Sequence, residues 1–250
     1  MRLAETGWQR IGPDPRIAAW AAAALPVAQA VLAATDEAWR CGETWFVGVD
    51  ALPNGPDGGV GGASFPWAAL PLEPLPLHRA QLSVVRPGYP QPWSGEDETA
   101  FRFRRNRDAA HLDGLLPVGP DKRRMVKEPH AWILGLPLNA CGAGASPLVV
   151  WDGSHRVMQA ALARAFQGHS GTDLADIDIT EVYKAARAEV FRTCRRLELP
   201  AQPGEATLLH RLTVHGVAPW AEGAKAPREG RIIAYFRPLL GKVSDWIAAD

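Results

Sequence analysis

Three side chains have the types and the spacing to hold a metal ion. His111 and Asp113 are separated by one residue, and on an extended segment two such residues point to the same face. A second histidine, His215, ends an apolar run and stands directly before a glycine. Two histidines and one carboxylate can occupy one face of an iron ion and leave the opposite positions open for other ligands. We therefore expect a metal site made by His111, Asp113 and His215.

An arginine further along the chain predicts a place for an anion. Arg231 begins a run rich in β-branched and aromatic residues that ends at Phe236. An arginine on a buried strand needs an anionic partner, because a buried and unpaired charge is very costly. A dicarboxylate such as 2-oxoglutarate would supply that partner in bidentate geometry. Arg228 is the rival in a loop-like stretch, and Arg156 and Arg237 are further candidates, but a surface position is favoured for all three.

Other histidines and one tryptophan are weaker candidates for the site. His155 stands where a helix is expected to start, which favours a structural role over metal binding. His210 lies five residues before the metal histidine, and this odd offset places the two on opposite faces of a strand. Trp220 is the best placed tryptophan for a substrate cavity, because it follows the metal strand in a loop. His130 precedes a core strand and is a candidate for the cavity mouth, although a surface position is favoured.

The alternation of apolar runs and turn residues predicts a β-rich core. From about residue 79 onward, short apolar runs recur between Gly, Pro, Asn and Asp. Short strands at such spacing are typical of a β-sandwich or barrel. The expected strands cover residues 43–49, 80–86, 131–139, 147–151, 206–215 and 231–236.

Helices are expected at both sides of this core. The expected helices cover residues 14–39, 155–166 and 179–197. The first begins at Asp14 with Pro15 in its first turn, where a missing N–H costs nothing, and a break or kink is expected at Pro26. Thr180 is the expected N-cap of the last helix. We expect one domain, with a core barrel at about 79–238, supporting segments at 14–78 and a helical insertion at about 155–200.

Composition narrows the class of protein. Lys plus Arg and Asp plus Glu both number 27, so the chain lacks the basic surplus of a duplex-binding protein. The basic run 122–124 is expected to be a solvated turn. Three separated cysteines form neither a disulfide framework nor a zinc pattern, which favours a reducing compartment. The apolar stretch 17–34 is interpreted as a packed helix, so we expect a cytoplasmic protein without a membrane or nucleic-acid partner.

Several short motifs stand in the order found in one known family. The chain resembles the phytanoyl-CoA dioxygenase family of iron(II)- and 2-oxoglutarate-dependent oxygenases over roughly two thirds of its length. Residues 110–114 (Ala-His-Leu-Asp-Gly) resemble the first metal motif of that family, and residues 204–216 resemble the second. A core strand at 131–139, a strand and turn at 146–156, and Arg231 in the place of the cosubstrate arginine complete the resemblance. Several motifs in order are more specific than any one of them.

The resemblance implies a fold, cofactors and a reaction. The implied fold is mainly β with flanking helices, built on a double-stranded β-helix of the jelly-roll or cupin type. His111, Asp113 and His215 would hold iron(II), and Arg231 would pair with the far carboxylate of 2-oxoglutarate, with ascorbate as a candidate reductant. The implied reaction hydroxylates an unactivated C–H of a small molecule and releases succinate and CO2. The carboxylate of Asp113 favours hydroxylation or another outcome of hydrogen abstraction over halogenation, because related halogenases lack it.

The sequence departs from the family's pattern at two places and leaves two other functions open. Val217 stands where the family often has Ser or Thr, so the sequence does not supply a hydroxyl contact to the cosubstrate. Ala109 and Ala110 stand where the family often has Gln or a second His, so the partner of His111 is not given either. The other functions are a metal-dependent isomerase or lyase on the same barrel and a non-catalytic barrel that binds a small ligand.

Overall fold

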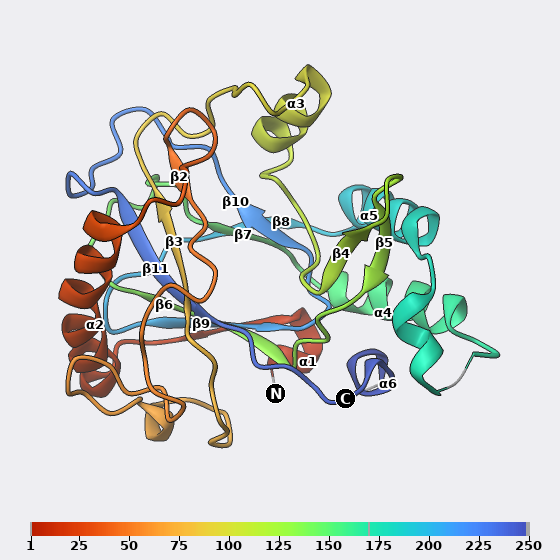
Figure 1. Ribbon diagram of the computed structural model, residues 1–250, viewed down its shortest axis with the longest axis horizontal. Helices are drawn as coiled ribbons and strands as arrows, with labels where there is room; N and C mark the ends of the chain where they lie inside the picture. Colours follow the sequence, from red (N-terminus) through yellow and green to blue (C-terminus); the bar gives the residue numbers. More distant parts are fainter. Residues whose placement is uncertain (1, 170, 249–250) are drawn as a thin grey trace.

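Two antiparallel sheets form the centre of the molecule (Figure 1). The computed structural model describes residues 2–169 and 171–248. The larger sheet contains, in spatial order, β1 (Trp8–Ile11), β9 (Ala206–His210), β6 (Trp132–Pro137), β11 (Arg231–Phe236), β3 (Gln81–Val85) and β2 (Trp45–Phe46). The smaller sheet contains β10 (His215–Val217), β7 (Leu148–Trp151) and β8 (Arg196–Leu199).

The path of the chain between these sheets defines the fold. The strand β3 lies in the larger sheet, the segment at His111 pairs with β10 of the smaller sheet, and β6 returns to the larger sheet. Next come β7 and β8 in the smaller sheet, β9 in the larger, β10 in the smaller and β11 in the larger. Eight antiparallel core segments that alternate in this way between two sheets make a jelly roll, the double-stranded β-helix. The prediction of this fold is confirmed.

The two faces of the larger sheet pack against two different apolar clusters. On β11, the side chains of Ile232, Ala234 and Phe236 belong to the cluster beneath the long N-terminal helix. Since successive side chains of a strand point to opposite faces, Arg231, Ile233 and Tyr235 face the smaller sheet instead. A compact apolar cluster fills part of that inner space, formed by Ile133, Leu148, Val150, Leu199 and Leu209. The strand therefore carries Arg231 into the interior of the barrel.

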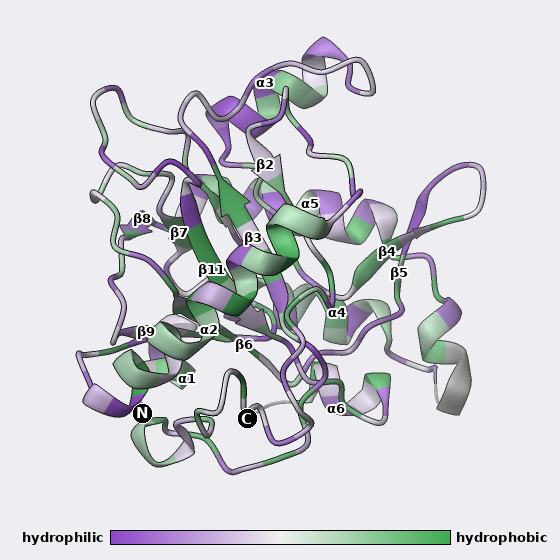
Figure 2. Ribbon diagram, turned by 60° about the vertical axis from the view of Figure 1, so that its left-hand side comes forward, coloured by the Kyte–Doolittle hydropathy of each residue, from purple (hydrophilic) through white to green (hydrophobic). Residues whose placement is uncertain are grey.

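The helix α2 (Pro15–Ala34) covers the outer face of the larger sheet, as both views of the molecule show (Figures 1 and 2). Asp14 is its N-cap and accepts a hydrogen bond from the backbone N–H of Arg16, as the sequence predicts for this start. The helix continues through Pro26 without a break and ends at Ala34, earlier than expected. By length and hydropathy α2 could cross a membrane, but its fully buried residues pack against the sheet, as expected for a core helix.

Helices and a hairpin pack against the outer face of the smaller sheet, in an apolar cluster that includes Val149 and Trp151 of β7. They are α4 (Ser154–Ala165), η2 (Gly171–Asp176), α5 (Thr180–Thr193), α6 (Val243–Ile247) and the hairpin of β4 (Leu115–Val118) and β5 (Arg123–Val126). The helix α3 (Glu98–Asn106) lies apart from them, at the top of Figure 1. The remaining short elements are α1 (Arg2–Thr6) and η1 (Trp67–Ala69).

Four expectations about these elements are wrong in detail. The expected strand 206–215 is divided into β9 and β10, which lie in different sheets. The helix expected to end at 197 stops at Thr193, and β8 follows it, so the helical insertion is shorter than predicted. Ile179, not Thr180, is the N-cap of α5. The basic run at 122–124 is not a solvated turn throughout, because β5 begins at Arg123.

Candidate metal centre

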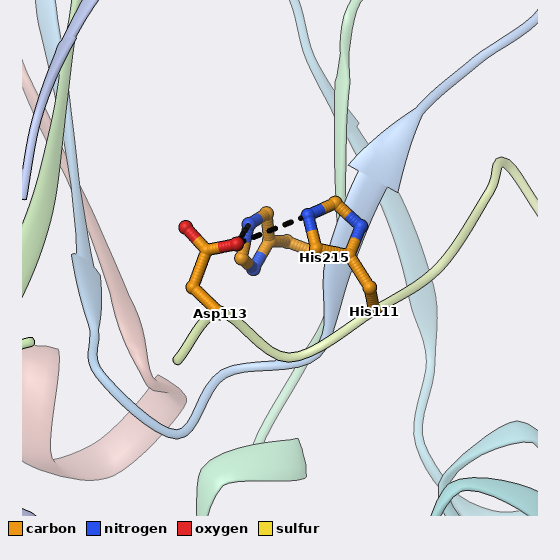
Figure 3. A group of neighbouring side chains, drawn as sticks. All are labelled: His111, Asp113 and His215. Atoms are coloured by element: carbon orange, nitrogen blue, oxygen red, sulfur yellow. Dashed lines mark ion pairs between the residues drawn. The ribbon is translucent and has the colours of Figure 1, made fainter. Parts of the chain in front are cut away.

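The two histidines are neighbours in one β-ladder. The backbone N–H of His111 donates to the carbonyl oxygen of His215 at 2.9 Å, and the N–H of His215 donates back to His111 at 3.1 Å. This reciprocal pair extends the smaller sheet beyond β10 and places both side chains at the same height (Figure 3). His111 and His215 lie far apart in the sequence, and these backbone hydrogen bonds bring them together as predicted.

The glycine after each metal motif permits a close backbone approach. A Cβ on Gly216 would lie 2.1 Å from the carbonyl oxygen of Asp108, so only glycine lets the segment before His111 pack against β10. The carbonyl of Asp108 accepts a hydrogen bond from Val217 at 2.8 Å, and its carboxylate is held in bidentate geometry by Arg196 of β8. The segment that leads into His111 is thus fixed at its backbone and at its side chain.

Both imidazole rings present the same nitrogen to a common point. The Nδ1 atom of His111 lies 3.0 Å from the carbonyl oxygen of Ala109, and the Nδ1 atom of His215 lies 2.9 Å from that of Thr213. A carbonyl can only accept, so each Nδ1 carries the hydrogen and each Nε2 is left as a free ligand atom. The carbonyl of Ala109 is the partner of His111 that the sequence did not reveal.

The carboxylate of Asp113 completes the cluster (Figure 3). Its Oδ1 atom lies 3.2 Å from Nε2 of His111 and 3.9 Å from Nε2 of His215, and the three ligand atoms all lie within 4.8 Å of one another. Bonds of about 2 Å from a central ion would bring such atoms to about 3 Å apart, so a small closing movement suffices. Two imidazoles and one carboxylate fit a first-row transition metal such as iron(II).

The three groups shift one another's pKa values. Burial would raise the pKa of Asp113, but its hydrogen bond with His111 and the charge of His215 hold that pKa well below the ordinary value. Burial and the nearby charge of His111 lower the pKa of His215 to about 4. For His111, burial acts to lower the pKa, yet the contact with Asp113 raises it overall. The cluster therefore holds an ionised carboxylate and a neutral His215 at neutral pH.

The second oxygen of Asp113 is held by an arginine that sequence reasoning placed at the surface. The Nη1 atom of Arg237 lies 3.3 Å from Oδ2 of Asp113, and the buried Nε atom of Arg237 has no hydrogen-bond partner in the described part of the chain. Arg237 follows β11, on the inward-facing series of Arg231, Ile233 and Tyr235. The alternation of that strand was the signal that could have identified it.

Two cavities meet at the cluster. The larger one, about 310 Å³, lies within the barrel and has Trp45, Ser83, Ile133, Leu148 and Val217 in its lining. The smaller one, about 190 Å³, lies beside β4 and β5. His111, Asp113 and Arg237 line both cavities, so a metal ion at the cluster would be open to each of them.

Arg231 is buried with no partner for its charge. Its side chain is 6% exposed, and none of its three guanidinium nitrogens has a hydrogen-bond partner among the described residues. Arg231 and Trp45 lie opposite Val85 on either side of β3, so the arginine and the tryptophan share the inner face of the sheet. Among the described residues, the Nε1 atom of Trp45 and the hydroxyl of Tyr89 are likewise buried without a hydrogen-bond partner.

These orphaned donors form a group that suits an anion. Burial raises the pKa of Tyr89 to about 12, although the charges of Arg104 and, more weakly, Arg231 act in the opposite direction. Tyr89 and Trp45 pack together with ring centroids 6.1 Å apart. A desolvated guanidinium with two neutral N–H and O–H donors needs a carboxylate or a similar group to satisfy it. Trp45 and Tyr89 were not identified from the sequence.

The remaining candidates lie outside both cavity linings. His130 is buried, with Nδ1 2.9 Å from the carbonyl oxygen of Arg237 and Nε2 3.5 Å from Glu128. Trp220 packs against the cluster of Cys41, Val85 and Tyr89, and its indole N–H donates to Ala224 at 3.3 Å. Their roles in substrate binding stay predictions.

The rival histidines and arginines lie apart from the three candidate metal ligands, here called the metal cluster. The rings of His155 and His210 lie 5.0 Å apart, and His155 contacts the carbonyl oxygen of Ala4. Neither histidine is part of the group formed by His111, Asp113 and His215. Arg156 donates to the same carbonyl of Ala4, and Arg228 is exposed.

Comparisons with known proteins give distant structural likenesses. No family model and no curated protein matches the sequence. Among solved structures, the chain is similar to the non-heme alpha ketoglutarate dependent carbocyclase SnoK from nogalamycin biosynthesis, with 14% identity over 94% of this chain and 80% of that one and a TM-score of 0.47. It is also similar to EctD from S. alaskensis with 2-oxoglutarate and 5-hydroxyectoine, with 15% identity over 94% and 73% of the chains and a TM-score of 0.44.

A third structure carries both an iron ion and the 2-oxo acid. The epimerase SnoN in complex with Fe3+, alpha ketoglutarate and nogalamycin RO shares 14% identity over 94% of this chain and 80% of that one, with a TM-score of 0.49. Likenesses at this distance do not assign a function. The strand order and the ligand geometry of the present chain define its class on their own: a jelly-roll protein with a two-histidine, one-carboxylate cluster at its open end.

Proposed function

We propose that the protein is an iron(II)- and 2-oxoglutarate-dependent oxygenase that hydroxylates an unactivated C–H of a small molecule. One observation carries this proposal: the same barrel holds a preformed cluster of His111, Asp113 and His215 and a buried arginine, Arg231, whose charge has no partner. A metal that binds one end of a dicarboxylate and an arginine that binds the other explain both features together. We also propose that the protein is cytoplasmic and has neither a nucleic-acid nor a membrane partner.

Each residue has a definite part in this function. The Nε2 atoms of His111 and His215 and the Oδ1 atom of Asp113 would hold the metal, while Arg237 fixes the other oxygen of Asp113. Arg231 would bind the far carboxylate of 2-oxoglutarate. When bound, iron(II) with 2-oxoglutarate and O2 would supply the oxidising chemistry: one oxygen atom of O2 would convert C–H to C–OH and the other would enter succinate, with release of CO2.

The other orphaned donors and the cavity walls would assist this binding. The indole N–H of Trp45 and the hydroxyl of Tyr89 are available as neutral donors to the same carboxylate as Arg231. They would take the place of the family's hydroxyl, which is missing at Val217. The apolar side chains of Ile133 and Leu148 in the larger cavity would exclude water from the bound cosubstrate.

The direct test is turnover of 2-oxoglutarate. The protein is incubated in air with iron(II), 2-oxoglutarate, ascorbate and pools of small molecules, and succinate is measured. We expect succinate to form only with iron present and to increase with a pool that contains a substrate. Binding of a small molecule without succinate formation or chemical change would instead support the non-catalytic barrel.

The first residue-level prediction concerns Arg231. We expect Arg231→Ala to raise the 2-oxoglutarate requirement by one to three orders of magnitude, on the order of 1.4 to 4 kcal/mol, and to leave metal affinity nearly unchanged. Arg231→Lys should restore only part of the loss, because a point charge cannot reproduce the guanidinium fork. Titration calorimetry with 2-oxoglutarate in the presence of Mn(II) measures both effects.

The matched control is Arg228→Ala, which should be nearly silent because Arg228 is exposed. If Arg228 and not Arg231 controls the affinity, the assignment of the anion site is wrong. If neither arginine matters while the protein still transforms a substrate, the cosubstrate is not 2-oxoglutarate, and the isomerase or lyase function takes its place.

A further inference from the structure

We infer that the substrate carries an anionic group, a phosphoryl or a carboxylate group, and that Arg124 and Arg187 bind it in the smaller cavity beside the metal cluster. The inference rests on the proposed function and names the class of substrate for the same site. It does not involve Arg231, which does not line this cavity.

Three arginines from distant parts of the fold converge on the smaller cavity. Arg124 comes from β5, Arg187 from the middle of α5, and Arg237 follows β11. The cavity is also lined by His111 and Asp113, so any molecule within it lies next to the metal cluster. Positive charge is therefore gathered where the reacting part of a substrate must be placed.

Arg124 and Arg187 have no acidic partner among the described residues. The Nη1 atom of Arg187 donates to the carbonyl oxygen of Ala110 at 3.3 Å, and its guanidinium carbon lies 4.6 Å from the ring centroid of Phe103. The Nη1 atom of Arg124 donates to the carbonyl oxygen of Leu115 at 3.3 Å. These neutral contacts orient the two guanidinium groups and leave their charges unpaired.

The cations that point away from the cavity are paired in the usual way. Arg123 lies 3.3 Å from Asp178, and Lys127 makes an ion pair with Asp176. Both stand within three residues of Arg124 in the sequence. Among the described residues, the outward-facing cations of the hairpin thus form ion pairs with acids, whereas Arg124, which faces the cavity, forms none.

Acidic residues in the lining do not fully cancel this charge. Asp113 is engaged by Arg237, and Glu128 also lines the cavity, so the three arginines exceed the two carboxylates by one positive charge. A neighbouring cavity of about 270 Å³ shares Arg124 and Arg187 with the smaller one and adds further cationic side chains, Lys122 and Lys184. Asp121 also lines it, and Glu181 pairs with Lys184, so the excess charge there belongs mainly to the two arginines and Lys122.

The shape of the site limits the position of the anionic group in the substrate. At about 190 Å³ the smaller cavity holds only a small group, since a water molecule in the liquid takes roughly 30 Å³. Two guanidinium groups suit a phosphoryl or carboxylate group, whose oxygens accept paired N–H donors. An anion bound there places carbon atoms only a few bonds away beside the metal. We therefore expect oxidation close to the anionic group.

The test uses three aromatic probes that differ in their polar group: phenyl phosphate, benzoate and benzyl alcohol. Protein loaded with Mn(II) and 2-oxoglutarate is titrated with each probe by calorimetry. We expect at least one anion to bind at least tenfold more tightly than the alcohol. The stronger of the two anions identifies the group as phosphoryl or carboxylate.

Substitutions locate the binding. Arg124→Gln and Arg187→Gln should each weaken the preferred anion by tenfold or more, and Arg187→Lys should recover part of the loss while it keeps the charge. The control is Arg192→Gln on the same helix, because Arg192 is exposed and pairs with Glu189 at 2.6 Å. The Arg192→Gln variant should bind the anion with the same affinity as the unchanged protein.

Several outcomes would overturn the inference. They are equal binding of the alcohol, no binding of either anion, or anion binding that neither arginine substitution alters in variants that melt like the unchanged protein. Mn(II) and 2-oxoglutarate binding are measured first, so loss of the proposed function would be seen separately. The anion titration can then be repeated on the metal-free protein, where Arg124 and Arg187 should still select the anion.

Discussion

The orientation of the two imidazole rings is fixed by backbone carbonyls and does not depend on a metal. The carbonyl oxygens of Ala109 and Thr213 each hold an Nδ1–H, so both Nε2 atoms face Asp113 before any ion arrives. Such outer contacts typically change metal affinity by about 10- to 100-fold, although they never touch the ion. Because these partners are carbonyls, no side-chain pattern in the sequence could have revealed them.

Removal of one histidine should separate metal binding from folding. We expect His111→Ala to abolish Mn(II) binding, because two ligands remain, and to change the free energy of unfolding by about 1 kcal/mol or less. The reason is that the His111 side chain is 46% exposed and contributes little to the core. Calorimetric binding and thermal melting measure the two effects. The exposed His169→Ala is the control, and a collapse of folding in His111→Ala would make the site structural.

Proton competition at His111 should make metal binding pH-dependent. A metal-binding imidazole must be neutral, and the pKa of His111 is raised by its contact with Asp113 even though burial acts in the opposite direction. Below that raised pKa the affinity for Co(II) should fall about tenfold per pH unit, and above it the affinity should be constant. The pKa of His215 is about 4, so His215 contributes no slope above pH 5. A flat profile between pH 5 and 8 would contradict this assignment.

At the scale of elements, the metal cluster depends on how closely the segment before His111 approaches β10. We expect Gly216→Ala to destabilise the fold by roughly 1–3 kcal/mol, because its Cβ would lie 2.1 Å from the carbonyl oxygen of Asp108. The displaced segment would also carry His111 away from His215, so Mn(II) affinity should fall as well. Gly12→Ala meets no atom within 4 Å and is the neutral control. Thermal melting measures the stability of both variants, and titration measures their Mn(II) affinity.

The positions of several strands and the candidate metal ligands were accessible from the sequence because both leave short-range patterns. The run at 231–236 was predicted with the bounds of β11, since β-branched and aromatic residues there alternate between two cores. The run at 206–215 was predicted as one strand because no Gly or Pro marks the turn that separates β9 from β10. In this case the crossing from one sheet to the other is imposed by tertiary packing.

The side chains that we propose to bind anions show the other limit of prediction from sequence. Trp45 and Arg231 share one face of the sheet only because both pair with β3 at Val85, and no local spacing in the sequence indicates this neighbourhood. Arg124 was placed in a solvated turn because it lies in a basic run, and its direction depends on the register of the β4–β5 hairpin. Arg237 could have been found by continuing the alternation of β11 by one step.

At the scale of the whole molecule, stability and chemistry are supported by different faces of the larger sheet. The cluster under α2 contains Trp20, which is fully buried and donates from Nε1 to the carbonyl oxygen of Gly58 at 2.9 Å. The metal cluster lies on the other side of that sheet, at the open end of the barrel. The two can therefore be perturbed separately.

We expect Trp20→Ala to lower the free energy of unfolding by roughly 3–5 kcal/mol, through lost packing and the cavity left behind. Below the melting temperature of the variant, Mn(II) affinity should match that of the unchanged protein. Trp93→Ala is the control, since Trp93 is 39% exposed and its loss should change stability by about 0.5 kcal/mol at most. A fall in Mn(II) affinity that parallels the fall in stability would show that the two faces are coupled.

The reciprocal backbone pair of His111 and His215 also bears on which ion the protein acquires. Because the sheet holds the two histidines in place, the ligand set should have nearly the same geometry with or without an ion. It therefore cannot discriminate between iron(II) and other divalent ions by a conformational change on binding. Two imidazoles and a carboxylate then follow the general affinity order of divalent ions, in which cobalt, nickel and copper bind more tightly than iron(II). Iron loading of the proposed oxygenase would accordingly be decided by metal supply in its surroundings, and preparations from metal-rich media would carry nickel or cobalt in an inactive form.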